Sequence, residues 1–347
     1  MTTPLWDIIQ NVFSSLEKSQ RDRLWSVANQ INPNFILDDL LNPQDHPSLL
    51  LSPKFNYEDG YLSALQAARI AVNEALKSSN SHAHPVMKIQ KHLFPMGWFI
   101  EDVHAWQVRE HILKARALNP SNKQPAVVFD LDGTLFDVSS RTLGLFREWL
   151  KTEEAHQFPA QLLKKAQRID FEHVGYSLKH AVENAGFVLD PKSLEYQFFH
   201  LAQKYWDQRF FDGKSLVQYD CPIPGARTFL WQLQEDGLTI VYLSGRSKKR
   251  MTEGTHNQLE KHDFPINGTA TFLKEDPKMD DHEYKERQFA TINKKYAIYG
   301  NFENEYINLF SMAKVESNCV HVIVDSMHSA RPVDKFDHTV FRVSSYL

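Results

Sequence analysis

The stretch that decides the fold is Ala126-Val-Val-Phe-Asp-Leu-Asp-Gly-Thr-Leu-Phe136. A short apolar run ends abruptly in two carboxylates, Asp130 and Asp132, and Gly133 and Thr134 follow at once. A run of this kind indicates a buried β-strand. Because unpaired buried charge is strongly unfavourable, two acids at the tip of such a strand need a neutralising partner. A bound divalent cation together with phosphate chemistry would explain both acids.

The composition predicts a folded, soluble protein. The 347 residues suggest two or three domains, and 42% hydrophobic residues are enough to bury a large core. The 39 basic and 43 acidic residues nearly balance, which argues against a nucleic-acid partner. The first residues lack the features of a signal peptide, and no apolar run approaches the roughly 20 residues that span a bilayer. We therefore expect a cytoplasmic protein with no membrane partner, by default rather than from a positive signal.

Residues 1–118 are expected to form a helical N-terminal region. Apolar residues repeat at helical spacing from Leu5 to Leu16, and further helices are expected at 60–77 and 101–118. These helices could pack on the catalytic domain, form a homo-oligomer or extend the pocket, and packing is the plainest of the three. The polar segment 119–125 is the clearest linker in the chain.

Apolar, β-rich segments recur after this linker, with helical patterns between most of them. The first expected strand ends in Asp130, and the later ones cover 239–244, 270–273, 296–302, 320–324 and 339–343. This alternation predicts an α/β fold, a Rossmann-like parallel sheet with helices on both faces. Ligands bind at the carboxyl ends of the strands in such a sheet. Asp130, Ser244 and the acidic group near residue 303 lie at predicted strand ends, so this fold would bring them together.

Four segments resemble the motifs of the haloacid dehalogenase (HAD) superfamily of phosphotransferases. Asp130-Leu-Asp-Gly-Thr134 matches the first motif, and Tyr242-Leu-Ser-Gly-Arg246 matches the second. Lys285 is similar to the lysine of the third motif, and Gly300-Asn-Phe-Glu-Asn-Glu305 occupies the place of the acidic fourth motif. The resemblance covers about residues 125–345. It implies a catalytic core, 125–140 and 220–347, and a helical cap, 141–219, inserted between the first two motifs.

The resemblance also implies a role for each motif residue. Asp130 would be the nucleophile and form an aspartyl-phosphate. Asp132 would protonate the leaving oxygen and later deprotonate water. Ser244 would donate a hydrogen bond to the transferred phosphoryl group, and Lys285 would offset charge on the nucleophile and phosphate. Residues expected to contact the substrate phosphate are Gly133, Thr134, Gly245 and Arg246.

A divalent cation is expected because a carboxylate that attacks a phosphate dianion meets strong repulsion. Mg²⁺ suits this role because it prefers oxygen ligands and binds through one or two carboxylates. The implied metal ligands are Asp130, Asp132, Glu303 and Asn304.

Two assignments stay open at this stage. Lys274 follows a predicted strand and competes with Lys285 for the catalytic role. The fourth motif departs from the usual pattern, because Asn301, Glu303, Asn304 and Glu305 stand where aspartates are common, and Asp325 is a further carboxylate at the same sheet edge.

The expected function is that of a Mg²⁺-dependent phosphomonoester hydrolase. A cap that roofs the site excludes water and folded macromolecules, so the expected substrate is a small phosphorylated metabolite. A polynucleotide 3'-phosphatase is one alternative. A non-catalytic module that binds phosphate or a partner is another, because the fourth motif is atypical.

Overall fold

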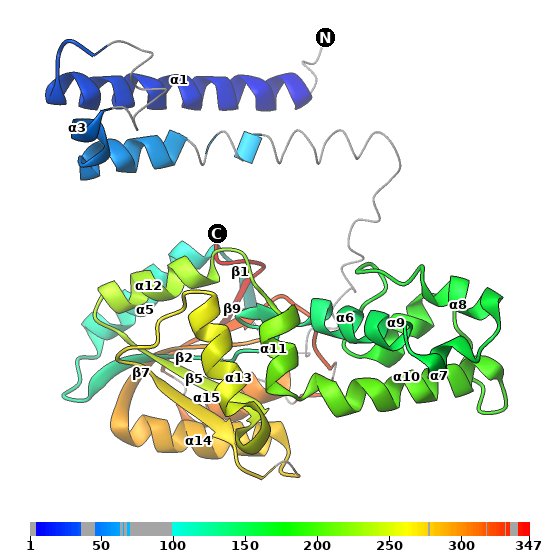
Figure 1. The fold of residues 1–347 in the computed structure, drawn as a ribbon. Helices are drawn as coiled ribbons and strands as arrows, with labels where there is room; N and C mark the ends of the chain where they lie inside the picture. The colour runs from blue at the N-terminus through cyan, green and yellow to red at the C-terminus, as the bar shows by residue number, and fades with distance from the viewer. Residues whose placement is uncertain are drawn as a thin grey trace. The chain divides into compact units, whose positions relative to one another are not determined.

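Seven strands form one parallel sheet in the computed structural model (Figure 1). Most of these strands are apolar segments that the sequence analysis expects to be strands. The strand order is β1-β9-β8-β7-β2-β5-β6. Their bounds are β1 Phe99–Asp102, β2 Gln124–Phe129, β5 Thr239–Ser247, β6 Ala270–Lys274, β7 Tyr296–Glu303, β8 Val320–Val324 and β9 Thr339–Val343. The predicted α/β fold with a parallel sheet is confirmed.

The structure describes residues 5–35, 46–62, 65, 68–69, 99–276, 278–316, 318–329, 331–333 and 339–347. The chain divides into two units, residues 1–90 and 91–347. Each is described by itself below.

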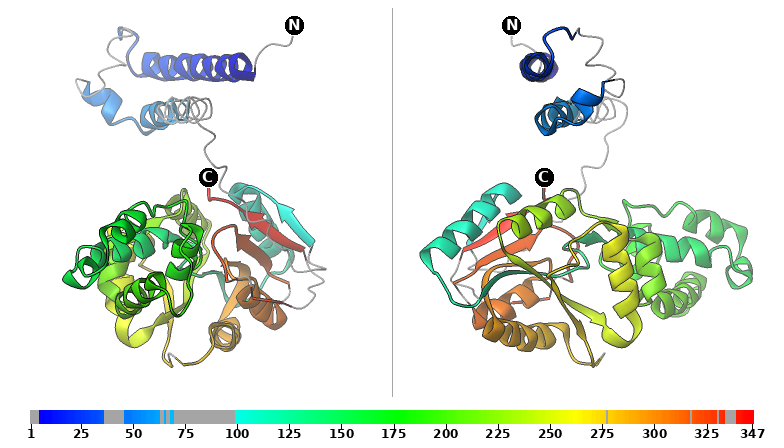
Figure 2. Two further views of the ribbon diagram at one scale, coloured as in Figure 1. Left: turned by 90° about the vertical axis from the view of Figure 1, so that its right-hand side faces the viewer. Right: turned by 60° about the vertical axis from the view of Figure 1, so that its left-hand side comes forward.

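Helices cover both faces of the sheet (Figure 2). On one face, α5 (Ala105–Leu118), α12 (Ala226–Glu235) and α13 (Lys248–Lys261) bury apolar side chains against β2, β5 and β7. On the other face lie α14 (Asp281–Lys295) and α15 (Tyr306–Val315). A central strand with both faces covered reads as one continuous apolar run, and this is the pattern of Ala126–Phe129.

Residues 99–118 differ from the expectation of a purely helical N-terminal region. The segment 99–102 is an edge strand, β1, which pairs with β9, and the helix begins at Ala105 rather than at residue 101. Val108 and Ile112 of this helix are fully buried in the core of the sheet domain. A strand of four residues that carries two acids has no alternating apolar pattern, so its sequence gives no strand signal.

Five helices between β2 and β5 have a hydrophobic core of their own, formed around Trp149 and Phe198. They are α6 (Ser139–Trp149), α7 (Glu153–His156), α8 (Ala160–Ala166), α9 (Leu178–Asn184) and α10 (Leu194–Phe210). We call residues 139–210 the helical insertion (Figure 1). A short antiparallel ladder, β3 (Phe136–Asp137) with β4 (Cys221–Pro222), joins the two ends of the segment that contains it.

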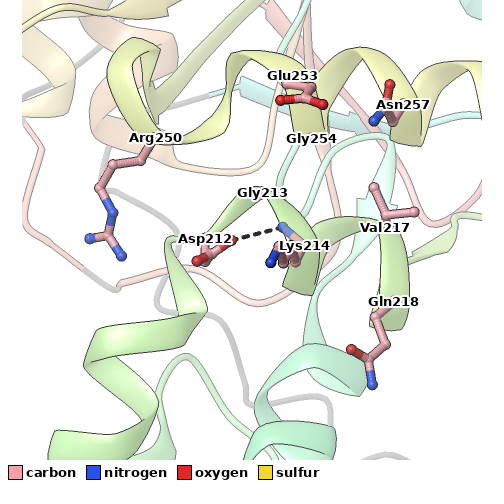
Figure 3. Close-up of a pocket in the computed structure, with 9 residues that line it drawn as sticks. All are labelled: Asp212, Gly213, Lys214, Val217, Gln218, Arg250, Glu253, Gly254 and Asn257. Atoms are coloured by element: carbon pink, nitrogen blue, oxygen red, sulfur yellow. Dashed lines mark hydrogen bonds between the residues drawn. The ribbon is translucent and has the colours of Figure 1, made fainter.

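Helix α11 (Gly213–Tyr219), which the sequence assigns to the cap, packs on α13 of the sheet domain (Figure 3). The crossing is tight, because a Cβ atom added at Gly254 would lie 2.2 Å from the Cα atom of Gly213. A hollow of about 430 Å³ flanks this crossing, and polar side chains such as Arg250 and Asn257 line it. The glycine pair therefore fixes the C-terminal end of the inserted segment to the sheet domain.

The N-terminal unit is helical as far as the structure describes it. Helix α1 spans Leu5–Ile31, α3 spans Pro47–Leu50, and residues 53–62 form another helix. Leu24, Val27 and Phe55 belong to the small core of this unit. Most of the helix predicted at 60–77 lies outside the described residues. Among the described residues, every helix is too short or too polar to span a membrane.

Candidate active site

The first carboxylate of the site, Asp130, comes directly after β2 at the carboxyl edge of the sheet. Its backbone N–H donates to the Phe302 carbonyl at 3.0 Å, which keeps β2 against β7 at this point. The Lys285 Nζ atom, from α14, lies 2.8 Å from Asp130 Oδ1 and 2.5 Å from Glu303 Oε2. All three side chains are at least nine-tenths buried. The structure thus brings Asp130 and Glu303 together, as their predicted strand ends imply, and Lys285 joins them from α14.

One lysine stands between two buried carboxylates, so negative charge is in excess. Burial raises the pKa of Asp130 to about 7, although Lys285 opposes the shift. Burial also raises the pKa of Glu303 above its usual range. Burial alone would lower the pKa of Lys285, but the two carboxylates raise it above its usual range. The site is therefore short of one positive charge when both acids are ionised.

Thr134 and Asn304 complete the immediate surroundings of Asp130. The Thr134 hydroxyl lies 3.5 Å from Asp130 Oδ2 and 3.4 Å from Asn304 Oδ1. The Asn304 amide nitrogen donates to the carbonyl of Met327 at 2.7 Å. A carbonyl only accepts hydrogen bonds, so this contact fixes the amide nitrogen toward Met327 and turns the amide oxygen toward Thr134.

Gly133 has a steric reason to be glycine. Its φ angle is +79°, and an added Cβ atom would lie 2.3 Å from Asn304 Nδ2. Only glycine adopts this backbone conformation without cost and leaves room for the asparagine. The turn after β2 and the segment after β7 therefore pack against each other at the predicted site.

The second carboxylate of the first motif, Asp132, is held by two buried arginines. Arg246 donates to Asp132 Oδ1 at 2.8 Å and to Oδ2 at 3.1 Å, and Arg141 donates to Oδ1 at 2.7 Å. Burial would raise the pKa of Asp132, but the two guanidinium groups hold it well below its usual range. Arg246, which the resemblance assigns to substrate binding, is thus engaged with a protein carboxylate.

Arg141 and Asp220 are buried partners that the sequence analysis does not identify. Arg141 donates to Asp220 Oδ1 at 2.7 Å and to Oδ2 at 2.5 Å, and Gln258 donates to the same Oδ2 at 2.7 Å. Burial raises the pKa of Asp220, while its arginine contacts oppose the shift. Arg141 begins the helical insertion and Asp220 follows α11, so this ion pair also ties the two ends of the inserted segment. The sequence signal for Arg141 is weak, because α6 contains a second arginine, Arg147, and nothing in its local pattern points to Asp220.

Ser244 and Gly245 lie on β5, the strand next to β2. Ser244 is 1% exposed, and its hydroxyl accepts a hydrogen bond from the Arg246 backbone N–H at 3.4 Å. A Cβ atom added at Gly245 would lie 2.8 Å from the Asp281 carboxylate, so this residue lines the same edge beside the start of α14.

The structure separates the residues that the sequence leaves as alternatives for the catalytic lysine and the fourth motif. Lys274 pairs with Asp281 rather than with Asp130, so Lys285 is the lysine at the site. Asp325 lines another hollow together with Asp102 and Arg342. Asn301 is fully buried within β7, and neither atom of its amide has a hydrogen-bond partner among the described residues.

Glu305 lies at the site and is held by the loop after β8. Its carboxylate accepts hydrogen bonds from the backbone N–H and hydroxyl of Ser329, at 2.7 and 2.6 Å. Burial raises the pKa of Glu305 above its usual range, and the charges of Lys285 and Asp130 also act on it.

The donor set fits a hard cation such as Mg²⁺. Among the described residues, no three His, Cys, Asp or Glu side chains gather around one point. Mg²⁺ does not need such a cage, because it keeps several waters and binds through one or two carboxylates and other oxygens. Asp130 and the amide oxygen of Asn304 are suitable donors, and Glu305 lies close by. Asp132 and Glu303, also predicted as ligands, are engaged by Arg246 and Lys285, and Lys285 contacts Asp130 as well.

One part of this chain is similar to a known protein family. Residues 192–319 match the family model described as HAD superfamily, subfamily IIIB (Acid phosphatase). No curated protein matches the chain.

Solved structures of the superfamily are similar at low identity. A class C acid phosphatase from Bacillus anthracis with tungstate bound is 19% identical, with a TM-score of 0.31, over 58% of this chain and 60% of that protein. A predicted phosphoglycolate phosphatase from Haemophilus somnus is 15% identical, with a TM-score of 0.40, over 65% of this chain and 96% of that protein. A HAD-superfamily hydrolase from Ehrlichia chaffeensis is 16% identical, with a TM-score of 0.35, over 65% of this chain and 94% of that protein. These superpositions place no residue of the site.

The family match covers the second motif, Lys285 and the fourth motif, and the first motif lies beside them at the carboxyl edge of the sheet. This part of the chain is therefore similar to the acid phosphatases of the HAD superfamily.

Proposed function

We propose that the protein is a Mg²⁺-dependent phosphomonoester hydrolase in which Asp130 is the nucleophile. The observation that supports this most is the buried Asp130 carboxylate, held at the carboxyl edge of a parallel sheet by Lys285 at 2.8 Å. Burying such a carboxylate costs free energy. Buried acids with a shifted pKa are typical of functional sites. The neighbouring excess of negative charge suits a site that binds a cation together with its substrate.

The reaction takes place in two displacements. An oxygen of Asp130 attacks the phosphorus atom, the phosphorus–oxygen bond to the leaving group breaks, and the leaving oxygen takes up a proton. The oxygen of a water molecule then attacks the phosphorus of the aspartyl-phosphate, and the bond to Asp130 breaks to release inorganic phosphate. Lys285 offsets negative charge on Asp130 throughout. When bound, Mg²⁺ supplies the further positive charge that the nucleophile and phosphate dianion need.

Asp132 is the proposed proton donor and acceptor, and its ion pairs set a condition on that role. Because the arginines hold the pKa of Asp132 well below its usual range, its carboxylate is ionised in the free protein near neutral pH. To donate a proton to the leaving oxygen, it must first be released in part from Arg141 or Arg246. We propose that substrate binding loosens one of these contacts.

The proposed substrate is a small phosphorylated molecule. Met327, from the loop after β8, packs against the core of the helical insertion, so the insertion lies beside the catalytic edge. Tyr176, on the turn before α9, has an exposed ring. The charges of Glu305 and Asp281, at the carboxyl edge, act on its phenol. A tyrosine that close to the edge is suited to contact the leaving group of a compact substrate.

An assay of phosphate release from a generic aryl phosphate tests the proposal. We expect activity with Mg²⁺ that is lost on addition of EDTA and in Asp130→Asn. Asp263→Asn is the matched control, because the Asp263 side chain is 71% exposed and remote from the edge. Activity that survives both EDTA and Asp130→Asn would refute the proposal. A panel of phosphorylated metabolites and a 3'-phosphorylated oligonucleotide then separates a small-molecule phosphatase from a polynucleotide 3'-phosphatase.

A further inference from the structure

The loop after β8 contacts both catalytic segments of the chain. We call residues Ser326–Ser329 the β8 loop. The Ser326 hydroxyl donates to the carbonyl of Gly133 at 2.6 Å, which ties the loop to the turn after β2. Ser329 donates twice to Glu305, which ties the loop to the segment after β7. The β8 loop is thus placed to set the relative position of these two segments.

Met327 lies at the centre of this loop and faces two directions. Its carbonyl accepts the hydrogen bond from the Asn304 amide at 2.7 Å. Its side chain packs against the hydrophobic core of the helical insertion, the core that also contains Trp149 and Phe198. One residue therefore links the packing of the insertion to the orientation of a side chain at the site.

The orientation of Asn304 matters because its two amide atoms have different chemistry. The oxygen can bind a cation, whereas the nitrogen cannot. The bond to Met327 turns the oxygen toward Thr134, whose hydroxyl is 3.5 Å from Asp130. If this carbonyl moved away, the amide could rotate and present nitrogen to the same point.

We propose that Met327 is a positioning residue: its side-chain contact with the helical insertion places its carbonyl, which holds the Asn304 amide oxygen toward the Mg²⁺ and phosphate site. This inference rests on the proposed function. It follows that the position of the insertion influences cation binding through Asn304. Partners of this kind, which orient a metal ligand, change metal affinity by about 10- to 100-fold when they are removed.

The test compares Met327→Ala with Met327→Leu in the full chain. Alanine removes the contact with the insertion, and leucine retains an apolar side chain of similar size. Leu162→Ala is the matched control, because Leu162 is 8% exposed in the same core but lies on α8, at the end of the insertion away from the sheet (Figure 1). Both alanine variants lose packing in the insertion, and only Met327→Ala loses the link to Asn304.

The first readout is the Mg²⁺ concentration at half-maximal thermal stabilisation, measured without substrate. The second is the Mg²⁺ dependence of aryl phosphate hydrolysis. We expect both midpoints to rise about 10-fold in Met327→Ala, and to stay near the wild-type value in Met327→Leu and Leu162→Ala. Midpoints in Met327→Ala that match those of Leu162→Ala would overturn the inference. A wild-type protein with neither Mg²⁺ stabilisation nor hydrolysis would instead overturn the proposed function, and this inference with it.

Discussion

Two charge clusters, largely buried, lie side by side at the carboxyl edge of the sheet, and their net charges differ. In the lysine cluster, Lys285 stands between Asp130 and Glu303, so one positive charge faces two negative ones. In the arginine cluster, the guanidinium groups of Arg141 and Arg246 face the two carboxylates of Asp132 and Asp220. The first cluster has a negative excess, and the second is neutral.

The two aspartates of the first motif show the effect of this difference. Burial raises the pKa of Asp130 to about 7. The arginines hold the pKa of Asp132 well below its usual range, although burial acts on this carboxyl as well. Two acids that are two residues apart thus have opposite shifts, because only one of them has enough positive charge nearby. The lysine cluster needs a further cation to be fully ionised, whereas the arginine cluster does not.

The largest effect is expected when the lysine cluster loses its only positive charge. Lys285→Met leaves two buried carboxylates without their cationic partner, so we expect roughly a 10³-fold loss of aryl phosphatase activity. The free energy of unfolding should also fall, because unpaired buried carboxylates are costly. Enzyme kinetics and urea denaturation measure the two effects.

Lys274→Met is the matched control for this change. Lys274 pairs with the half-exposed Asp281, and pairs of this kind contribute about 0–1 kcal/mol. Activity should stay close to that of the wild type. Equal losses in both lysine variants would contradict the assignment of Lys285 to the site.

The arginine cluster should respond mainly in stability. Arg141→Met leaves the buried Asp220 without its closest charge partner, so we expect a loss of about 3–5 kcal/mol in the free energy of unfolding. The double variant Arg141→Met, Asp220→Leu removes both charges of the pair and should recover part of that loss. Urea denaturation measures both. A double variant less stable than Arg141→Met would contradict the idea of a balanced pair.

The smallest effect is a pH dependence that separates the two clusters. The pKa of Asp130 is raised on folding, so its contribution to stability is present at low pH. That contribution is lost as the pH rises between the ordinary aspartate value of 3.8 and about 7. In EDTA, thermal unfolding of the wild type should show this decline, and Asp130→Asn should lack it.

Asp132 has the opposite sign, because its lowered pKa gives stability that is present above the ordinary value and lost only in stronger acid. Added Mg²⁺ should reduce the decline seen with Asp130, because a bound cation favours the ionised carboxylate. A wild-type profile identical to that of Asp130→Asn, with and without Mg²⁺, would show that the lysine cluster has no charge excess.

The sequence predicts most of the strands of the sheet and the position of the two acids of the lysine cluster. Residues such as Asp130 and Ser244 follow apolar runs, and the carboxyl ends of parallel strands meet at one edge. The resemblance favours Lys285 over Lys274 as the catalytic lysine, and the structure brings Lys285 to Asp130. The acidic strand β1 lacked a pattern that could reveal it.

The arginine cluster and the β8 loop could not be predicted from the sequence. Arg141 and Asp220 are 79 positions apart, and a salt bridge between distant residues has no local pattern. Met327 contacts Asn304 through its backbone carbonyl, which every residue possesses, so the sequence gives no signal of this contact. Contacts of this kind depend on tertiary packing, whereas strand ends and glycine turns can be predicted from the local sequence.

The most direct test of the central claim is to trap the phosphoryl group on Asp130. The protein is mixed with an aryl phosphate and Mg²⁺, quenched rapidly in acid, digested and analysed by mass spectrometry. We predict one phosphoryl group on the peptide that contains Asp130, present during turnover and absent from Asp130→Asn. Turnover without any phosphorylated peptide, or with the phosphoryl group on another residue, would contradict the account.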